Sequence, residues 1–205
     1  MPDQENLDMT FTSSEKDTDD AKDSGPANLV AEKLFKSRAV TVFGEINDKI
    51  ARTVTEKLLA LAGESDETIF VYISSPGGHV ESGDVVYDMI KFIKPQVKVI
   101  GTGWVASAAT TIYLAAKKEN RFSLPNTRFL VHQPSGGSRG DATDIKIQAD
   151  EIVKTRARIN QLIADETGQP LDRVARDTDR DYWMTVEEAT DYGIVGSVVS
   201  SITEI

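Results

Sequence analysis

The residues of this chain that could do chemistry include a serine among small neighbours, two histidines and three clustered aspartates. Ser107 lies in the segment 103–110, Gly-Trp-Val-Ala-Ser-Ala-Ala-Thr, where small side chains let a substrate approach the backbone closely. Hydrolysis by serine needs a nucleophile on a constrained turn, a histidine that takes its proton, and backbone N–H groups facing the oxyanion. The segment lacks the Gly-x-Ser-x-Gly pattern of α/β-hydrolases. Taken alone, a serine in such a segment is more often a simple helix N-cap than a nucleophile.

Two histidines could serve as the base, and the residues around them do not choose between them. His79 directly follows Gly78. His132 follows a β-rich run and precedes Gln133-Pro134, where the proline restricts Gln133 to extended geometry. Each histidine could also be structural.

The carboxylate and the oxyanion donors are open in the same way. Asp177, Asp179 and Asp181 crowd one short loop, and any of them could orient a histidine. The segment 75–78, Ser-Pro-Gly-Gly, has the composition of a tight turn. Two glycines after a strand could equally leave N–H groups free to donate to an oxyanion.

Short β-rich runs alternate with helical patterns, which predicts an α/β fold with parallel strands joined by right-handed crossovers. The predicted strands are Ala39–Phe43, Thr68–Ile73, Val97–Ile100, Arg128–Val131 and Ile194–Val199. Helices are predicted over residues 48–63, 85–93, 106–116, 141–167, 170–176 and 185–193, the last with a capping box of Thr185 and Glu188. Ligands bind beyond the carboxyl ends of such strands, so segment 75–78, Ser107 and His132 should converge at one edge.

The predicted helix Asp141–Thr167 has a geometry of its own. Its apolar positions form one stripe: Ile145, Ala149, Ile152, Ile159 and Ile163. At about 1.5 Å per residue the helix would be about 40 Å long, more than a domain of this size covers easily. The stripe therefore predicts contact with a partner, such as a second copy of the chain. The alternative is a helix packed wholly on its own sheet.

Composition excludes several classes of function. The 205-residue chain has a net charge of −10 and no cysteine, which excludes disulfides, thiolate metal sites and a cysteine nucleophile. The acidic balance makes nucleic acid an unsuitable partner, and two histidines without cysteine argue against structural zinc. No apolar run is long enough to span a membrane, and no secretory signal is expected at the N-terminus.

Residues 1–27 differ from the rest of the chain. They hold eight acids against two lysines and few large apolar residues. Such a segment cannot bury enough surface to offset its ordering entropy, so we expect an acidic disordered tail, either without a role or used for docking or regulation. The remaining residues, 28–205, are expected to form one domain.

Taken together, the segments resemble the proteolytic subunit of the Clp protease family over about residues 31–199. The Ser-Pro-Gly-Gly loop is residues 75–78, the nucleophile segment ends at Ser107, and the His-Gln-Pro segment begins at His132. The Arg-Asp-Thr-x-Arg-Asp segment is residues 176–181 and the Glu-Ala-x-x-Tyr-Gly segment is residues 188–193. Departures from the family pattern include Trp104, Val105 and Ala108-Ala109, and a serine at position 135 where a large apolar residue is common.

The resemblance implies the residues of a site. The nucleophile would be Ser107, the base His132 rather than His79, and the orienting acid Asp181. The N–H groups of Gly78 and Ala108 would form the oxyanion hole. Substrate would lie extended between a strand after Gly78 and a Gly-rich strand at residues 136–140 and pair through main-chain hydrogen bonds. Gly77, Val80 and Ser135 are the expected substrate-binding residues.

The resemblance also implies an architecture and partners. The fold would be the ClpP/crotonase-like α/β fold, with repeated ββα units and a protruding handle helix. Two stacked heptameric rings, a tetradecamer, would enclose the active sites in a cytoplasmic serine endopeptidase that degrades unfolded polypeptides. The resemblance implies that the peptidase would need no metal and no cofactor, because ATP would be used only by a partner AAA+ unfoldase. That partner is expected even though an acidic segment replaces the family's axial-loop region.

Two other functions are compatible with parts of this pattern. A crotonase-type acyl-CoA enzyme would share the fold and an oxyanion pocket, but it needs no Ser-His-Asp set. A non-catalytic ring subunit would pair with an active paralogue, but it would not need a complete set of catalytic residues.

Overall fold

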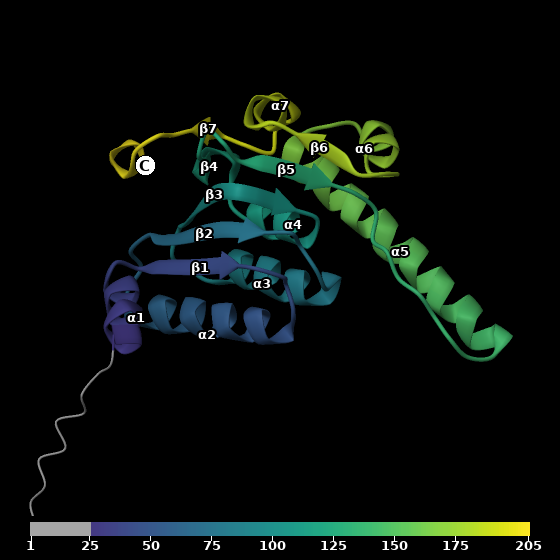
Figure 1. Ribbon diagram of the computed structural model, residues 1–205, viewed down its shortest axis with the longest axis horizontal. Coiled ribbons are helices and arrows are strands. Elements are labelled where there is room, and N and C mark those ends of the chain that lie inside the picture. The colour runs from purple at the N-terminus through teal and green to yellow at the C-terminus, as the bar shows by residue number, and fades with distance from the viewer. Residues whose placement is uncertain (1–25) are drawn as a thin grey trace, which may run out of the picture.

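A twisted sheet forms the centre of the molecule. The computed structural model describes residues 26–205 (Figure 1). The strands are β1 (Ala39–Phe43), β2 (Ile69–Ser75), β3 (Val97–Ala106), β4 (Arg121–Ser123), β5 (Arg128–Val131), β6 (Tyr182–Met184) and β7 (Ser197–Val198). Strands β1-β2-β3-β4-β7 are parallel neighbours in this order. Strand β5 pairs in parallel with the second half of β3 and antiparallel with β6.

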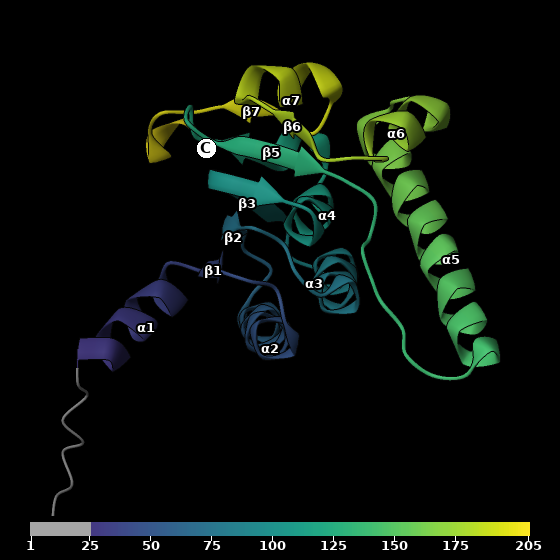
Figure 2. The same cartoon turned by 45° about the vertical axis from the view of Figure 1, so that its right-hand side comes forward.

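Helices α2, α3 and α4 cover one face of this sheet (Figure 2). The helices are α1 (Pro26–Lys36), α2 (Asp48–Glu64), α3 (Val80–Phe92), α4 (Ala108–Leu114), α5 (Ala142–Thr167), α6 (Leu171–Asp177) and α7 (Val186–Tyr192). Two 3-10 turns, η1 (Lys118–Asn120) and η2 (Ile202–Glu204), complete the described elements. No helix within residues 26–205 is long and apolar enough to cross a membrane.

The predicted α/β fold is confirmed, with local differences. Strand β1 has the predicted bounds, and the capping box of Thr185 and Glu188 is present at α7. The predicted helix 48–63 is α2, and its N-cap is Asn47, whose side chain accepts from the N–H of Ile50 at 3.0 Å. Strand β3 continues past Ile100 to Ala106, so the glycines at 101 and 103 lie inside the strand.

The expectation of two substrate-pairing strands is wrong for this chain. Helix α3 begins at Val80, directly after the glycine loop, and Gly78 makes only an isolated bridge to Ile46. Residues 136–140 belong to no strand. A strand is stabilised by hydrogen bonds to a neighbour, and within residues 26–205 this segment pairs with none.

The core lies between the sheet and its covering helices. Alternate residues of β2 are buried, and Val71 and Ile73 pack with Leu58 of α2 and Val86 of α3. A second, small apolar cluster lies on the other face of the sheet. It comprises Ile100, Phe122 and Val199, with Phe70, Tyr72, Leu124 and Ile205 packed against them.

Helix α5 projects from the rest of the molecule (Figures 1 and 2). Its buried residues, from Ile159 to Ala164, are all in its C-terminal half. Towards the N-terminal end Ile145, Ile147 and Val153 are 45, 51 and 65% exposed. The alternative of a helix packed wholly on its own sheet is therefore wrong. The predicted tail, residues 1–27, lies almost entirely outside the described residues and stays a prediction.

Candidate active site

The topology of the sheet brings distant parts of the sequence to one edge. Strands β2, β3 and β5 run in parallel, so the glycine loop after β2, Ser107 after β3 and His132 after β5 all follow carboxyl ends at this edge. Strand β6 runs the other way, and Tyr182 at its start pairs with Val131 at the end of β5. Asp181, directly before β6, therefore lies beside His132.

Ser107 is held in a strained turn between β3 and α4. Its backbone has φ 57° and ψ −124°, in the positive-φ region that non-glycine residues rarely adopt. Such a conformation costs about 1–3 kcal/mol and persists only where surrounding contacts enforce it. Here the Ser107 N–H donates to Leu130 O at 2.9 Å, and the Ser107 carbonyl accepts from Thr110 and Thr111.

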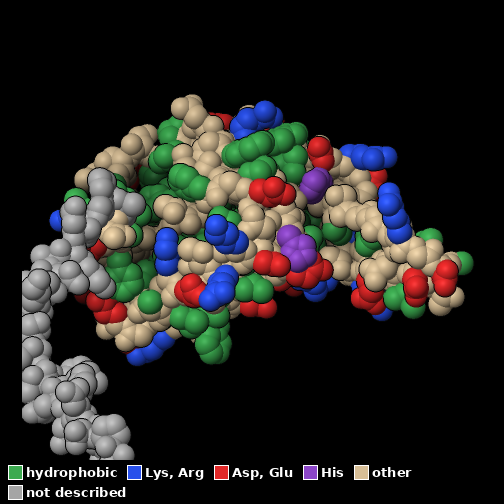
Figure 3. All heavy atoms as spheres, turned by 60° about the horizontal axis from the view of Figure 1, so that its bottom comes forward, with side chains coloured by type: hydrophobic (Ala, Val, Ile, Leu, Met, Phe, Trp, Pro, Cys, Tyr) green, Lys and Arg blue, Asp and Glu red, His purple; other side chains and the backbone are tan. Residues whose placement is uncertain are grey.

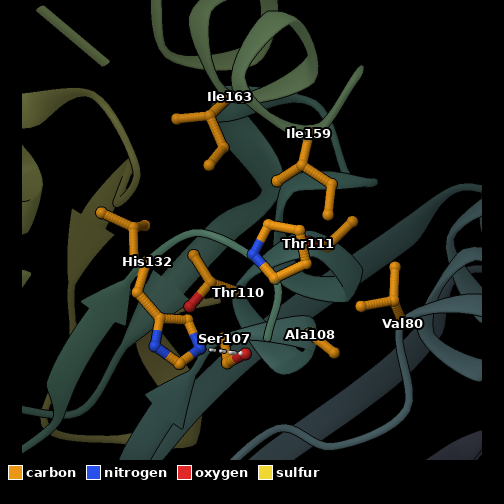
Figure 4. A pocket seen from close by; sticks show the side chains of 10 residues that line it. Val80, Ser107, Ala108, Thr110, Thr111, His132, Ile159 and Ile163 are labelled. Atoms are coloured by element: carbon orange, nitrogen blue, oxygen red, sulfur yellow. Dashed lines mark hydrogen bonds between the residues drawn. The ribbon is translucent and has the colours of Figure 1, made fainter. Parts of the chain in front are cut away.

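The Ser107 side chain does not cap the helix that follows. Ser107 is at the N-cap position of α4, yet its Oγ makes no capping hydrogen bond. Instead Oγ lies 2.7 Å from Nε2 of His132 (Figure 4). Ser107 therefore has the position of an N-cap but not its hydrogen bond, because its hydroxyl points to His132.

His132 is held between Ser107 and Asp181. Its Nδ1 lies 2.8 Å from Oδ1 of Asp181. The His132 side chain is 28% exposed and the Asp181 side chain 65%. A proton on Nδ1 that bonds the carboxylate leaves Nε2 unprotonated and able to accept from the serine hydroxyl. The structure thus brings together the serine, the histidine and the aspartate that the resemblance implied.

The other two aspartates of the loop are engaged elsewhere. Asp179 Oδ1 accepts from Arg156 at 2.9 Å, and Asp177 Oδ2 lies 3.4 Å from Nε of Arg173. Asp181 alone of the three contacts His132. Asp181 is selected by strand pairing, because it directly precedes β6, which pairs antiparallel with the end of β5 at Val131.

His79 has a different environment. Its Nδ1 lies 2.8 Å from Ser82 Oγ and 3.4 Å from Asp48 Oδ1, and its Nε2 lies 3.1 Å from Glu81 Oε2. Ser82 in turn donates to Asp48 at 2.6 Å. The second histidine therefore ties α3 to α2. Both histidines lie on the face seen in Figure 3, with acidic side chains beside them.

The glycine loop packs directly on the Ser107 turn. Gly77 has φ 90°, and a Cβ on it would lie 2.6 Å from both Ala106 O and Ser107 Cβ. The same Cβ would be 3.1 Å from the Ala108 nitrogen, so the loop and the start of α4 are adjacent. Within residues 26–205 neither the Gly78 N–H nor the Ala108 N–H donates to another protein group. Two backbone donors are thus free beside the serine, as an oxyanion requires.

A pocket opens beside Ser107 (Figure 4). Its walls include Val80, Pro134, Ile159 and Ile163. Of the three expected substrate-binding residues, Val80 lines this pocket. Gly77 and Ser135 do not, since Gly77 packs against the turn and Ser135 is exposed in the loop beyond Pro134.

Sequence reasoning missed a set of contacts from α5 to the catalytic loops. The Thr178 hydroxyl donates to Asn160 Oδ1 at 2.8 Å, and both side chains are buried. The Thr178 carbonyl accepts from Gln133 N at 2.6 Å, directly beside His132. Arg156, one turn before Asn160, bonds Asp179, whose carbonyl accepts from Gln133 Nε2 at 2.6 Å. The sequence signal for these contacts was the polar pair Arg156 and Asn160, which lie four residues apart beside the isoleucine stripe of α5.

A charged network at the end of α5 was also missed. Arg121 is 1% exposed, and its Nη2 lies 2.6 Å from Glu166 Oε2. Tyr87 donates to Glu166 Oε1 at 2.9 Å, and Lys91 lies 2.5 Å from the same oxygen. Burial and the Glu166 carboxylate raise the pKa of Tyr87, so its hydroxyl stays protonated and donates. Burial lowers the pKa of Arg121, and Glu166 opposes that change.

No group of three or more His, Cys, Asp or Glu side chains able to hold a metal ion occurs within residues 26–205. The arrangement of Ser107, His132 and Asp181 can instead transfer a proton from the serine hydroxyl to the imidazole without any metal.

Comparison with known proteins gives a consistent result. A family model described as Clp protease matches residues 22–202. The "ATP-dependent Clp protease proteolytic subunit 3" of Rhizobium etli is 59% identical over 172 residues, which cover 84% of this chain and 89% of that protein. A protein of the same description from Rhizobium johnstonii is 56% identical over 192 residues, covering 93% of this chain and 99% of its own length.

Solved structures agree. The "ClpP1 N165D mutant from Listeria monocytogenes" matches with a TM-score of 0.80 at 53% identity, covering 85% of this chain and 98% of that one. "ClpP1 from Listeria monocytogenes" matches with a TM-score of 0.77 at 52% identity over the same shares.

Proposed function

The chain belongs to the Clp protease family and is a serine peptidase of the Clp type, and we propose that Ser107, His132 and Asp181 carry its chemistry. The observation that supports this assignment best is the unbroken line of contacts Ser107 Oγ to His132 Nε2 at 2.7 Å and His132 Nδ1 to Asp181 Oδ1 at 2.8 Å. The α/β fold with its protruding helix is that of the matched ClpP structures.

The proposed reaction begins with attack of Ser107 Oγ on the peptide carbonyl carbon. His132 Nε2 takes the hydroxyl proton, and Asp181 stabilises the imidazolium that forms. The carbonyl oxygen becomes an oxyanion that accepts from the free N–H groups of Gly78 and Ala108. His132 then gives its proton to the leaving amine, and water hydrolyses the acyl-enzyme by the same route. These reaction steps need no cofactor in the peptidase.

The strained serine fits this reaction. Because the backbone turn holds the hydroxyl at hydrogen-bond distance from the base before substrate arrives, little ordering is left for the chemical step. The contacts of the folded protein already maintain the strained conformation, so substrate binding does not have to supply that free energy.

We propose further that copies of the chain assemble into two stacked heptameric rings. Two unlike apolar surfaces support a head-to-tail ring: Phe43 and Trp104 on the uncovered sheet face, and Val85 and Phe92 on the outer helices. Unlike surfaces that meet repeatedly close into a ring if the rotation allows it. The exposed isoleucines of projecting α5 supply a separate surface, by which two rings could meet.

The names of the matched relatives support an ATP-dependent partner. Both Rhizobium proteins are described as subunits of an ATP-dependent Clp protease, and this chain would likewise receive unfolded polypeptide from an AAA+ unfoldase. A cytoplasmic location remains a prediction, and a chain without cysteine needs no oxidising compartment.

Of the two alternatives, the crotonase-type acyl-CoA enzyme is wrong, because the matched relatives are peptidase subunits. The non-catalytic ring subunit is tested by peptide hydrolysis with the purified full chain. We expect hydrolysis that Ser107→Ala abolishes and that Ser200→Ala, at an exposed serine far along the chain, leaves unchanged. Wild-type activity in Ser107→Ala would contradict the proposal. An assembled wild type that hydrolyses no peptide would contradict it as well.

A further inference from the structure

The pocket beside Ser107 is bordered by two helices, α3 and α5. Val80, the first residue of α3, forms part of its wall, and Ile159 and Ile163 of α5 form another part (Figure 4). The free space in the pocket is only about 20 Å³. That volume holds about one water molecule, whereas an apolar group of the size of benzene needs about 150 Å³. A large substrate side chain can therefore enter only if these walls move apart.

An ion pair joins the same two helices. Nη1 of Arg158 donates to Oδ1 of Asp84 at 3.0 Å, and Nη2 donates to Oδ2 at 2.5 Å. Two parallel hydrogen bonds between a guanidinium and a carboxylate fix the relative position of both groups. The Asp84 side chain is 22% exposed and the Arg158 side chain 49%, so water screens the pair only in part. The pair therefore resists separation of α3 and α5.

The two partners of this ion pair are close to the pocket walls along each helix. Asp84 lies four residues after Val80, which places both side chains on one face of α3. Arg158 directly precedes Ile159 on α5. Because each helix is rigid over a single turn, a change in the distance between Asp84 and Arg158 also changes the distance between Val80 and Ile159.

A second link between the helices lies farther from the pocket. Tyr87 of α3 donates to Glu166 Oε1 of α5 at 2.9 Å, and Lys91 lies 2.5 Å from the same oxygen. None of these three residues lines the pocket. Loss of the contact between Arg158 and Asp84 should therefore let the helices move apart at the pocket without detaching them from each other.

We propose that the ion pair of Arg158 and Asp84 limits the size of the side chain that the pocket accepts from the residue before the cleaved bond. Both are positioning residues, because neither lines the pocket and both act through Val80 and Ile159. The inference rests on the proposed function, since it takes the pocket beside Ser107 as the place of this side chain. Entry of a leucine side chain weakens the ion pair, whereas an alanine side chain enters with the pair intact.

The test compares two fluorogenic peptides that differ only in the residue before the cleaved bond, leucine or alanine. The readout is the ratio of kcat/KM for the leucine peptide to kcat/KM for the alanine peptide. Arg158→Gln removes the cation and should raise this ratio about 2- to 5-fold, the range that partly exposed ion pairs give. Asp84→Asn should raise it by less, because Glu81 and Asp88 also attract the charge of Arg158.

A double variant and a distant ion pair provide the controls. Arg158→Gln combined with Asp84→Asn should match Arg158→Gln alone, because one ion pair can be broken only once. Glu56→Gln breaks an exposed pair of the same chemistry on α2, where Arg52 Nε lies 2.7 Å from Glu56 Oε1. No residue of α2 lines the pocket, so this variant should leave the ratio unchanged.

The outcomes separate this inference from the proposed function. A wild type that cleaves neither peptide would contradict the assignment of Ser107 and, with it, the inference. A wild type that cleaves peptide, with a ratio that Arg158→Gln leaves unchanged or lowers, would overturn only the role of the ion pair. An equal fall for both peptides would also overturn that role, because it indicates general damage and not a wider pocket.

Discussion

At the scale of single residues, the site depends on a serine whose backbone has a positive φ, a conformation that non-glycine residues rarely adopt. The positive φ of Ser107 turns its hydroxyl away from the N-terminus of α4 and towards His132. Gly77 enables this turn, because a side chain there would collide with Ala106 and Ser107. The geometry of the nucleophile is therefore set partly by a residue thirty positions earlier in the chain.

Gly77→Ala should inactivate the peptidase without unfolding it. The added Cβ would lie 2.6 Å from Ala106 O and from Ser107 Cβ, so the loop and the turn must separate. A displacement of about 1 Å at reacting groups costs about 10²-fold in rate, and we expect kcat to fall at least that much. Peptide hydrolysis and circular dichroism measure the two effects. Gly137→Ala, where a Cβ meets nothing within 4 Å, should behave as wild type.

Asp181→Asn should lower kcat and leave the fold intact. An amide at this position no longer stabilises the imidazolium and can favour the wrong tautomer of His132. We expect a loss of about 10²- to 10⁴-fold in kcat, towards the smaller value because Asp181 is 65% exposed. Asp191→Asn, at an exposed aspartate of α7, is the control. Equal activity of Asp181→Asn and wild type would contradict the role given to the carboxylate.

Some site residues could be recognised from the sequence alone and others could not. The run of small residues around Ser107 and the glycine loop are local features that constrain the chain directly. The choice of His132 over His79, and of Asp181 over its neighbours, depends on which strands pair and in which direction. Spacing along the chain does not contain that information, so the motif resemblance was needed to select them.

At the scale of elements, α5 connects the projecting surface to the catalytic loops. Asn160 holds Thr178, and Arg156 holds Asp179, only a few residues before Asp181. The neighbouring Ile159 and Ile163 form a wall of the pocket. A change in the position of this helix would therefore act on the pocket and on the acid together.

Asn160→Ala should weaken both stability and catalysis. It leaves the buried Thr178 hydroxyl with only its 2.9 Å bond to Val174 O, and losing a buried partner costs about 1–3 kcal/mol. Because Thr178 also holds Gln133 beside His132, we expect kcat to fall as well. Thermal unfolding and peptide hydrolysis report the two effects. Gln161→Ala, exposed at the next position of α5, should change neither measurement appreciably.

Glu166→Gln should destabilise the fold more than removal of a surface charge does. The variant leaves Arg121 charged and buried, although three backbone carbonyls still accept from it. Breaking a buried ion pair costs about 3–5 kcal/mol, and these carbonyls should reduce the loss to about 2–4 kcal/mol. Asp66→Asn, which breaks the exposed pair with Lys94, should cost about 0–1 kcal/mol. Comparable midpoints in urea for the two variants would contradict the importance of burial.

Most elements could be predicted from periodicity, whereas short strands and pairing partners could not. The β-rich runs identified β1 and β2, and the long apolar stripe identified α5. Strands β4 and β6 have three residues each, too few for a period to be recognised. The strands implied at residues 136–140 and after Gly78 were wrong for this chain, because pairing requires a neighbour that the described residues do not supply.

At the scale of the whole molecule, the exposed apolar side chains are distributed on separate surfaces. Those of the sheet face and the outer helices are the two sides of one head-to-tail contact, and those of the projecting α5 supply a second contact. A ring of identical chains with a second ring docked on it uses each of them once. The native mass should then be fourteen times the chain mass of 22.4 kDa.

Ile147→Glu should separate the rings. The side chain is 51% exposed on the projecting part of α5, and a charge there would be desolvated in a ring-to-ring contact. We expect the native mass to fall to half that of wild type, as measured by native mass spectrometry. Ile202→Glu places the same charge at an exposed isoleucine of η2 and should keep the full mass. An unchanged mass in Ile147→Glu would assign the contact to another surface.

Covalent labelling of the assembled wild-type particle shows whether Ser107 is the nucleophile. A fluorophosphonate reacts with an activated serine, and peptide mass spectrometry locates the adduct. We expect one adduct per chain, on Ser107, which disappears in His132→Ala because the hydroxyl loses its base. An adduct on a different serine, or none in a particle that hydrolyses peptides, would contradict it.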